Sequence, residues 1–308
     1  MTASTSTARL QFFATQTIDL AAREALYSGQ LVVLKQVTAA KELVHYFADS
    51  FLDPPSAASD LHIQERIQYC EHFESSPDIH RLYRDIFKEA GLIHKETHWD
   101  RLRLRVQQSG DPIDKYTATT FGTGRFSSTL PIHRDTWASN LPQQLNWWMP
   151  LTSLHEDCTL IMYPSYFNVP VSNNSGSWSV QQLKQANKNA QEYPQLPTMR
   201  LVDGGIKIGG ESASSSASSS ASSSVVISRA ELEKDAVPIL IDPGDVLVFS
   251  GAHLHGSSVG GRKGSATRFS TEVRTYNCVD FDNKIGAINV DGNTTNLPNR
   301  KWFKELVL

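Results

Sequence analysis

The chain has few of the features that mark secreted, membrane-spanning or disulfide-stabilised proteins. Its 308 residues include three cysteines, Cys70, Cys158 and Cys278, an odd and widely spaced set that predicts no disulfide framework. No apolar run approaches the ~20 residues that a membrane helix requires. The polar N-terminal segment lacks the charged and apolar regions of a secretory signal. We therefore expect reduced cysteines, most simply small buried side chains, in a cytoplasmic protein.

The chain also has little net charge. Twenty-nine Lys and Arg against 32 Asp and Glu leave a formal charge of −3, which gives no electrostatic reason to expect nucleic acid or an anionic membrane as partner. A hydrophobic content of 40% and a charged content of 20% are typical of a globular protein. The length allows a sizeable core, and we expect one domain over residues 1–308. The pattern leaves the oligomeric state open.

Residues 1–99 are expected to be rich in helix. A short buried strand is predicted at 29–35, where leucine and β-branched residues run continuously. Thr38 has the chemistry of an N-cap, and apolar residues at helical spacing predict a helix from there to about Phe51. A second helix is expected at about 78–90. Neither contains an obvious catalytic cluster, so this part is interpreted as a buttress for the rest of the chain.

From Arg101 the hydrophobic pattern changes to alternation, which is typical of strands. Leu102, Leu104 and Val106 fall on one face, and polar residues fall on the other. Further strands are predicted at 116–121, 145–150, 159–163, 238–241, 246–250 and 268–276. Many short strands separated by turn residues favour a sandwich, jelly roll or barrel over a parallel sheet. We therefore expect a mainly β core at about 100–280, followed by a C-terminal extension at 281–308.

A low-complexity tract interrupts this core. Residues 212–224 contain only serine and alanine, and glycines precede them, so the segment at about 204–225 has almost no apolar surface to offset its ordering entropy. It is expected to be a flexible surface insertion between two strands, with a mobile lid as the alternative.

A metal site is indicated by a His-x-Asp pair, His133 and Asp135. On a strand the two side chains would point to the same face, and a distant histidine would complete two imidazoles and one carboxylate, a set that suits Fe(II) oxygen chemistry. His255 and His253 are rival candidates for that third ligand. His-x-Asp alone is weak evidence in a chain with ten histidines, so the residues that accompany it matter.

The strand predicted at 268–276 strengthens the case. By alternation it carries polar residues on a single face: Arg268, Ser270, Glu272 and Arg274. Buried polar groups need partners. A dicarboxylate would supply one, because guanidinium binds carboxylate through paired, charge-assisted hydrogen bonds.

Four motifs together carry a resemblance to a known family. In chain order they are His133-x-Asp135, Gly244-Asp245-x-Leu247-x-Phe249, His255-Gly256-Ser257 and Arg268-x-Ser270. This set resembles the Fe(II)/2-oxoglutarate-dependent oxygenases, in particular the phytanoyl-CoA hydroxylase-like branch, which includes many natural-product hydroxylases. The resemblance covers roughly residues 100–280. It implies a double-stranded β-helix core, of the jelly-roll or cupin-like kind, with flanking helices.

The resemblance also implies roles for individual residues. His133, Asp135 and His255 match the Fe(II) ligands. The cosubstrate 2-oxoglutarate would be bound by residues that match family positions or share the Arg268 strand face: Arg268, Ser257, Trp148 and Ser270. With O2 as the second cosubstrate, such an enzyme oxidises a small polar metabolite and releases succinate and CO2. Halogenating relatives lack the carboxylate ligand, so Asp135 favours hydroxylation, desaturation or ring closure.

Four residues are weaker candidates for contact with the small-molecule substrate: Trp137, Asn146, Arg274 and Arg125. Arg274 has a second interpretation, as a residue that supports the metal ligands. Two other functions stay open on the residues alone. One is a cupin-like metal enzyme that does not use 2-oxoglutarate, and the other is a non-catalytic jelly-roll binding module. Arg268 discriminates the first of these from the leading hypothesis, because a buried arginine facing the metal is needed only if a dicarboxylate binds there.

Overall fold

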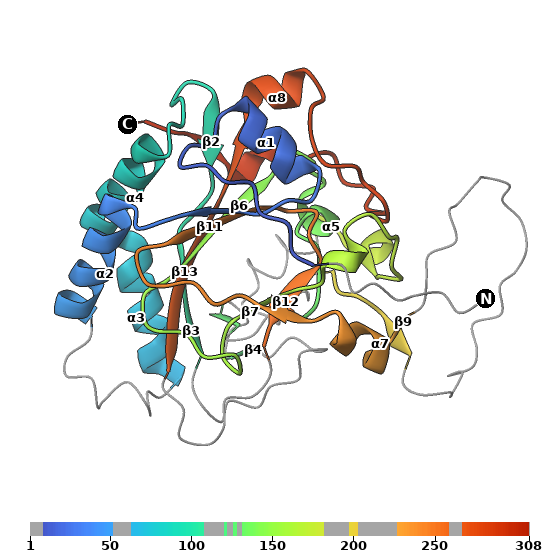
Figure 1. Ribbon diagram of the computed structural model, residues 1–308, viewed down its shortest axis with the longest axis horizontal. Coiled ribbons are helices and arrows are strands. Elements are labelled where there is room, and N and C mark those ends of the chain that lie inside the picture. The colour runs from blue at the N-terminus through green and yellow to red at the C-terminus, as the bar shows by residue number, and fades with distance from the viewer. Residues whose placement is uncertain are drawn as a thin grey trace, which may run out of the picture.

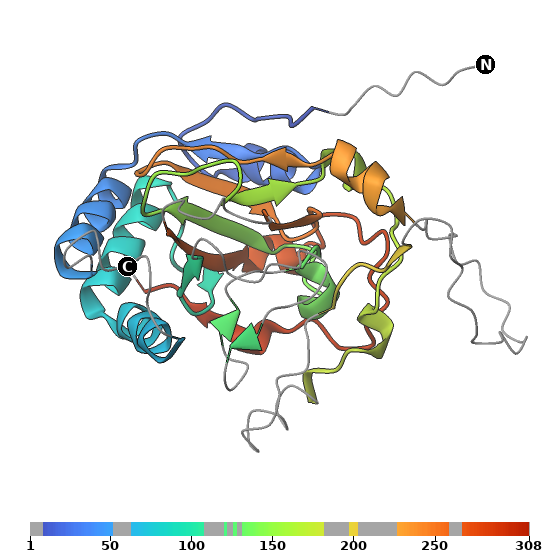
Figure 2. The ribbon, with the colours of Figure 1, turned by 90° about the horizontal axis from the view of Figure 1, so that it is seen from below.

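The computed structural model describes residues 9–51, 63–107, 120–121, 126–127, 131–181, 197–202, 227–258 and 267–307. Within these ranges two antiparallel sheets pack face to face, and helices cover the outer face of the larger sheet (Figures 1 and 2). None of the helices described combines the length and the apolar composition of a membrane-spanning segment.

The larger sheet has seven strands, and its longest strand, β13, is central to it. Along the sheet the order is β1 (Val32–Leu34), β11 (Val246–Ser250), β6 (Leu145–Pro150), β13 (Arg268–Asn277), β2 (Thr97–Trp99) and β14 (Lys304–Glu305), with β3 (Arg103–Gln107) also paired to β13. β13 pairs β6 on one side, with Arg274 opposite Asn146 and Glu272 opposite Trp148. On its other side Arg268 lies opposite Gln107.

The smaller sheet contains β10 (Val237–Pro238), β7 (Leu160–Met162) and β12 (His255–Ser257), in that order. Its residues Leu160 and Met162 pack against Trp148 and Leu247 of the larger sheet. From β6 onward the chain runs to β7 and β10 in the smaller sheet, returns to β11, crosses to β12 and returns again to β13. This alternation between two antiparallel sheets is the jelly-roll arrangement and confirms the predicted fold class, mainly β with flanking helices.

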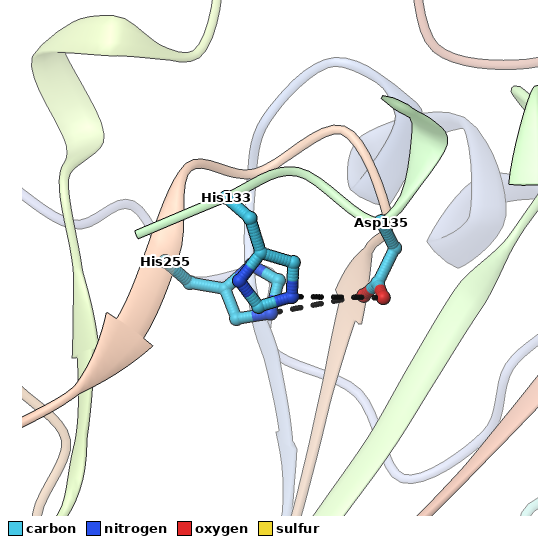
Figure 3. A group of neighbouring side chains, drawn as sticks. All are labelled: His133, Asp135 and His255. Atoms are coloured by element: carbon cyan, nitrogen blue, oxygen red, sulfur yellow. Dashed lines mark ion pairs between the residues drawn. The ribbon is translucent and has the colours of Figure 1, made fainter. Parts of the chain in front are cut away.

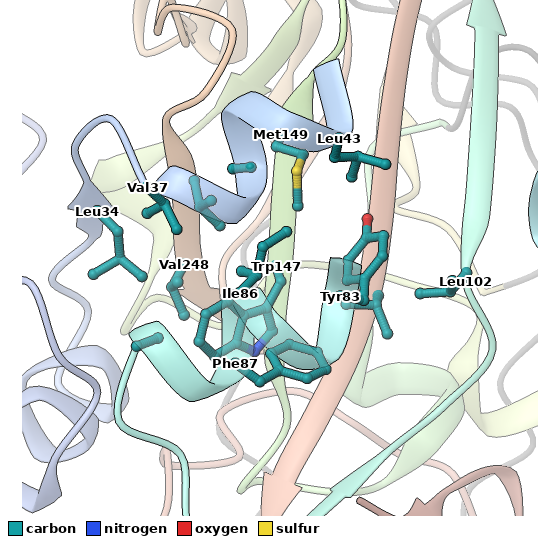
Figure 4. Packing of buried hydrophobic residues seen from close by; sticks show 14 of the residues in the cluster. Leu34, Val37, Leu43, Tyr83, Ile86, Phe87, Leu102, Trp147, Met149 and Val248 are labelled. Carbon is teal, nitrogen blue, oxygen red and sulfur yellow. The ribbon is translucent and has the colours of Figure 1, made fainter. Parts of the chain in front are cut away.

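Four helices precede most of the strands: α1 (Leu20–Tyr27), α2 (Thr38–Phe51), α3 (Ile63–Ser75) and α4 (Pro77–Glu89). The apolar stripe of α4 packs on the outer face of the larger sheet (Figure 4). Phe87 meets Trp147 edge to face, with ring centroids 5.1 Å apart. Trp147 is fully buried and donates its indole N–H to Thr275 Oγ1 at 2.9 Å. Because Trp147 and Met149 point outward into this core, Asn146 and Trp148 point into the space between the sheets.

The predicted helix at Thr38–Phe51 is confirmed, but its first turn is capped differently from the expectation. The Glu89 carboxylate at the end of α4 accepts the backbone N–H groups of Thr38 and Ala39, each at 2.8 Å. Thr38 is itself the first helical residue. The Glu89 carboxylate, which belongs to a neighbouring helix, therefore caps the first turn of α2 in place of the Thr38 side chain.

Short elements complete the described chain: β4 (Thr120–Phe121), β5 (Phe126–Ser127), α5 (Thr136–Ser139), η2 (Pro164–Tyr166), η3 (Ser175–Ser177), β8 (Leu201–Val202), β9 (Ile227–Ser228), α7 (Arg229–Lys234), α8 (Cys278–Asp282) and η4 (Arg300–Trp302). The strand expected at 116–121 is described only at its last two residues. The tract at 204–225 lies outside the described residues.

Candidate metal centre

Three side chains that are far apart in the sequence converge between the two sheets (Figure 3). His133 Nε2 lies 3.8 Å from Asp135 Oδ1, and His255 Nε2 lies 3.7 Å from Asp135 Oδ2. One ligand atom from each residue falls within 4.8 Å of the others. This is the only such group of His, Cys, Asp and Glu side chains within the described part of the chain.

Backbone carbonyls orient both imidazole rings. His133 Nδ1 lies 2.7 Å from the Pro131 carbonyl oxygen, and His255 Nδ1 lies 2.9 Å from that of His253. A carbonyl oxygen can only accept, so each Nδ1 carries the proton and each Nε2 presents a lone pair toward Asp135. Burial, with the neighbouring His133, lowers the pKa of His255 to about 4, which keeps the ring neutral. Neutral imidazoles with a fixed tautomer are the form that binds a metal.

The local structure that aligns His133 and Asp135 differs from the prediction of a continuous strand. His133 makes one antiparallel bridge, in which its N–H and C=O both pair with His255, at 2.9 and 3.0 Å. Asp135 has helical dihedrals (φ −64°, ψ −31°) and precedes α5. The two ligands therefore lie at a junction between a β-bridge and a helix. The bridge to His255 positions His133, and the start of α5 positions Asp135.

Two side chains donate hydrogen bonds to the Asp135 carboxylate. Asn146 Nδ2 donates to Oδ2 at 2.5 Å, and Arg274 Nη1 donates to Oδ1 at 3.3 Å. Arg274 is held in turn by Asp100, whose Oδ2 accepts from Arg274 Nε at 2.9 Å. Burial alone would raise the pKa of Asp135, but the charge of Arg274 lowers it below its usual range. Asn146 and Arg274, predicted as substrate contacts, thus lie where they orient the carboxylate.

His253, the rival ligand, lies in the turn before β12, outside this group. Its Nδ1 faces the Ser250 carbonyl at 3.0 Å and its Nε2 faces the Gly29 carbonyl at 3.1 Å. The ring packs on Phe167, with centroids 4.6 Å apart. Burial lowers the pKa of His253 to about 4. Both nitrogens point at backbone oxygens, so the structure brings His255, and not His253, to His133 and Asp135.

An arginine with an unsatisfied donor faces the same interior. The neighbour of Arg268 on β13, Phe269, packs outward on Phe47 of α2, with ring centroids 5.2 Å apart, so Arg268 points between the sheets. Arg268 is 4% exposed, and its Nε has no hydrogen-bond partner. Ser270 Oγ and Gln107 Oε1 are likewise buried and unsatisfied. Burial lowers the pKa of Arg268. A buried donor of this kind calls for an acceptor.

The remaining cosubstrate candidates also lie on the inner faces. Ser257 ends β12, two residues after His255, and is 7% exposed. Trp148 lies opposite Leu247 of β11 and packs in the apolar cluster between the sheets. The structure thus brings Arg268, Ser270, Ser257 and Trp148 to the interior that also contains the His-Asp-His group.

Further along this interior, two arginines of β3 form ion pairs, one with β13 and one with Asp100. Arg105 Nη2 lies 2.6 Å from Glu272 Oε1, and Arg103 Nη2 lies 2.6 Å from Asp100 Oδ2. Burial opposes ionisation of Glu272, but Arg105 and Arg103 overcome it and lower its pKa to about 2. The side chains of Arg105 and Glu272 keep 18% and 24% exposure. Polar groups therefore remain accessible on the inner face.

Two further residues, Trp137 and Arg125, were predicted to contact the substrate. Trp137 is fully buried in a cluster with Ile132 and Leu254, and its indole N–H donates to Asp291 Oδ1 at 2.7 Å. The indole therefore packs in this cluster and is anchored by Asp291, and its contact with a substrate stays a prediction. Arg125 lies outside the described residues. Arg134, which the sequence analysis did not single out because its partner lies 157 residues away, is 2% exposed and donates to Asp291.

No model of a protein family matches the chain, and no curated protein is similar to it in sequence. Solved structures with a related arrangement include EctD from S. alaskensis with 2-oxoglutarate and 5-hydroxyectoine, at 13% identity over 94% of this chain and 92% of that chain, with a TM-score of 0.44. ThoJ, a non-heme monooxygenase in its apo form, is 13% identical over 88% and 85% of the two chains, with a TM-score of 0.43. EvdO2 from Micromonospora carbonacea var. aurantiaca, complexed with 2-oxoglutarate, is 14% identical over 84% and 91%, with a TM-score of 0.41. At such identities and scores, the activity of this chain has to be inferred from its own site residues.

Proposed function

We propose that the chain is a non-haem Fe(II)/2-oxoglutarate-dependent oxygenase that hydroxylates, desaturates or cyclises a small polar metabolite. The observation that carries the proposal is the His133–Asp135–His255 group, with an unsatisfied buried arginine, Arg268, on the same interior. Two imidazoles and one carboxylate on a single face are the donor set of non-haem Fe(II) oxygenases.

The donor set fits Fe(II). Both Nε2 atoms carry lone pairs directed at the Asp135 carboxylate, and each Nδ1–H is held by a carbonyl. Arg274 and Asn146 fix the carboxylate and keep it ionised. Bound there, Fe(II) with 2-oxoglutarate as electron donor would activate O2, the oxidant, for attack on a substrate C–H bond. The protein's part is to orient the reactants and keep water from them.

The interior also fits a dicarboxylate. The Arg268 guanidinium is buried with a donor left over, and Ser270 Oγ two residues along the same face lacks a partner. A carboxylate between them would satisfy both groups through charge-assisted hydrogen bonds. Ser257 and Trp148 complete the proposed cosubstrate site. The cupin-like alternative without 2-oxoglutarate gives Arg268 no acceptor.

Three finer assignments belong to the same proposal. The order of the motifs from His133 to Ser270 supports the phytanoyl-CoA hydroxylase-like branch and a role in natural-product biosynthesis. The accessible Arg105–Glu272 pair supports a polar substrate. Cys70, Cys158 and Cys278 form no disulfide with one another, which fits a reducing compartment such as the cytoplasm.

Anaerobic titration with Fe(II) and then 2-oxoglutarate tests the proposal. We expect the weak visible charge-transfer band of the metal chelate in the wild type and no band in His133→Ala. Arg268→Met should still bind Fe(II) but need more 2-oxoglutarate, by roughly 10- to 150-fold, because a charge-assisted hydrogen bond contributes about 1.5–3 kcal/mol. Fe(II) binding without a band would favour the cupin-like enzyme, and absence of metal binding would favour the binding module.

A further inference from the structure

The residue between the two neighbouring ligands is a buried arginine. The side chains of His133 and Asp135 face the metal centre (Figure 3). The side chain of Arg134 is 2% exposed and donates to Asp291, which is not part of the centre. A guanidinium in such a place is costly to bury and needs many partners. Its position between two ligands makes those partners relevant to the centre.

All five N–H groups of Arg134 have acceptors. Its Nε donates to Asp291 Oδ2 at 3.2 Å. One terminal nitrogen donates to the Phe167 carbonyl at 3.3 Å and, by a short bond, to that of Ala252. The other donates to the carbonyls of Tyr166 at 2.5 Å and Val169 at 3.0 Å. Arginine presents five donors in a rigid fork, and here the fork is saturated.

These acceptors lie on three separate segments. Ala252 is in the turn that leads into His255, so Arg134 joins the two segments that carry the ligands. Tyr166 ends η2, and Phe167 and Val169 follow it in the loop after β7. Asp291 belongs to the C-terminal segment, and its carboxylate also accepts from Trp137 and from the Val171 N–H.

The C-terminal segment forms further hydrogen bonds with the residues that follow Asp135. Asn299 N–H donates to the Ser139 carbonyl at 2.8 Å, and Asn140 Nδ2 donates to the Asn296 carbonyl at 2.6 Å. Residues 287–299 thus run along α5 and the turn that follows. The segment expected to be a plain extension is bonded to the ligand-bearing part of the chain.

We propose that Arg134, anchored by Asp291, is a positioning residue for the metal centre. Its guanidinium holds the segment of His133 and Asp135 against the turn before His255, and so sets the distances among the three ligand atoms. The inference rests on the proposed function only in that a divalent metal binds at these ligands. Arg134 itself touches neither metal nor substrate.

Affinity for Mn(II), a redox-stable stand-in for Fe(II), tests this inference by calorimetry at a temperature where circular dichroism shows every variant folded. Arg134→Lys keeps the charge but has three donors and no planar fork. We expect this variant to bind Mn(II) at least tenfold more weakly than the wild type. Tenfold is the lower end of the loss of metal affinity that follows when a residue supporting the metal ligands is changed. Asp291→Asn should weaken binding in the same direction. The absorption spectrum of bound Co(II) should change in both variants, since it reports ligand geometry.

Arg23 and Asp280 provide matched controls. They form another arginine–carboxylate pair, 2.6 Å apart, with side chains 14% and 1% exposed, that contacts none of the three ligands. Arg23→Lys and Asp280→Asn should lower Tm yet bind Mn(II) within twofold of the wild type.

Three outcomes would overturn the inference. The first is Mn(II) binding within twofold of wild type in both Arg134→Lys and Asp291→Asn. If Arg134→Lys does not fold, Asp291→Asn alone decides. The second is an equal loss of Mn(II) affinity in the control variants, which would mean that Arg134 acts only through the overall stability of the fold. The third, a wild type that binds no divalent metal, would overturn the proposed function as well, and so is distinguishable from the other two.

Discussion

At the scale of single residues, the site is set by hydrogen bonds that fix tautomers and carboxylate orientation. His133 and His255 each give Nδ1–H to a carbonyl, so both expose Nε2. His253 differs from His255 by two positions, but its ring nitrogens face the Gly29 and Ser250 carbonyls. Residue type is therefore a poor guide to ligation without the direction of the ring.

Alanine variants of the two neighbouring histidines should separate these roles. We expect His255→Ala to lose Fe(II) binding, because one of three ligands is gone. His253→Ala should retain binding within a fewfold while losing stability by about 1–3 kcal/mol, since it removes the one N–H that the neutral ring can donate to a backbone carbonyl. Calorimetric Fe(II) titration under anaerobic conditions, with urea unfolding of each variant, measures both effects. Loss of metal in His253→Ala with retention in His255→Ala would reverse the assignment.

At the scale of elements, the turn before β11 helps to set the register of the larger sheet. Gly244 has φ +94°, and its carbonyl accepts the Val37 N–H at 3.0 Å, where the chain passes from β1 to α2. The next residue, Asp245, is fully buried in side chain and accepts from Gln36 N–H at 2.9 Å and from Lys35. The Pro-Gly-Asp turn thus joins β1 to β11, which leads to the His255 turn.

Gly244→Ala should destabilise the protein by about 1–2 kcal/mol, because an L-residue at this φ is strained. An added Cβ would also lie 2.6 Å from Lys41 Cγ, the stem of a flexible side chain. The free energy of unfolding in urea measures the effect. Gly176→Ala is the control: its Cβ would make ordinary contacts at 3.5 Å or more and its φ is not positive. Equal stability of the Gly244 and Gly176 variants would contradict the strain at Gly244.

At the scale of the whole molecule, two buried histidines that stay neutral make the free energy of unfolding depend on pH. The pKa of His253 and that of His255 are each lowered from 6.5 to about 4, chiefly by burial. The unfolded chain therefore binds more protons than the native protein between these values. This contribution is fully present above pH 6.5 and is lost as pH falls through 6.5 toward 4.

The metal-free protein should accordingly lose stability between pH 7.5 and pH 5, by an amount on the order of 1–2 kcal/mol per histidine over this range. Urea unfolding in the presence of a chelator measures it. His253→Gln should show a shallower dependence on pH, because one titrating group is removed. The exposed His45→Gln serves as control for the loss of a histidine. A His253→Gln profile parallel to the wild type would contradict the contribution of His253.

Several elements could be predicted from local pattern alone. The helix at 38–51 and the strands at 145–150 and 246–250 agree with the structure because apolar periodicity is strong there. α1 was missed because it has only eight residues, and α3 because its hydrophobic pattern is weak. β2 and β14 have only three and two residues, and their pairing depends on distant partners.

The site was predictable in its residue types and less so in its geometry. The four motifs indicated His133, Asp135, His255 and Arg268, which the structure brings to one interior. The strand expected to carry His133 and Asp135 is replaced by a bridge and a helix start. Arg134 and Asp291 were missed, since their pairing joins positions 157 residues apart.

By itself the strand pattern determined a mainly β core and left a sandwich, a jelly roll or a barrel open; the jelly roll followed from the resemblance carried by the four motifs. The sequence also determined the donor types of the candidate centre. Only the tertiary structure decided which histidine joins His133 and Asp135, which donors hold the carboxylate, and that the C-terminal segment closes on α5. The physical reason is the distance along the chain over which each interaction acts. Hydrophobic periodicity and turn chemistry depend on residues close together in the sequence. Ring direction, buried charge pairing and unsatisfied donors such as Arg268 Nε depend on which distant segments share the interior.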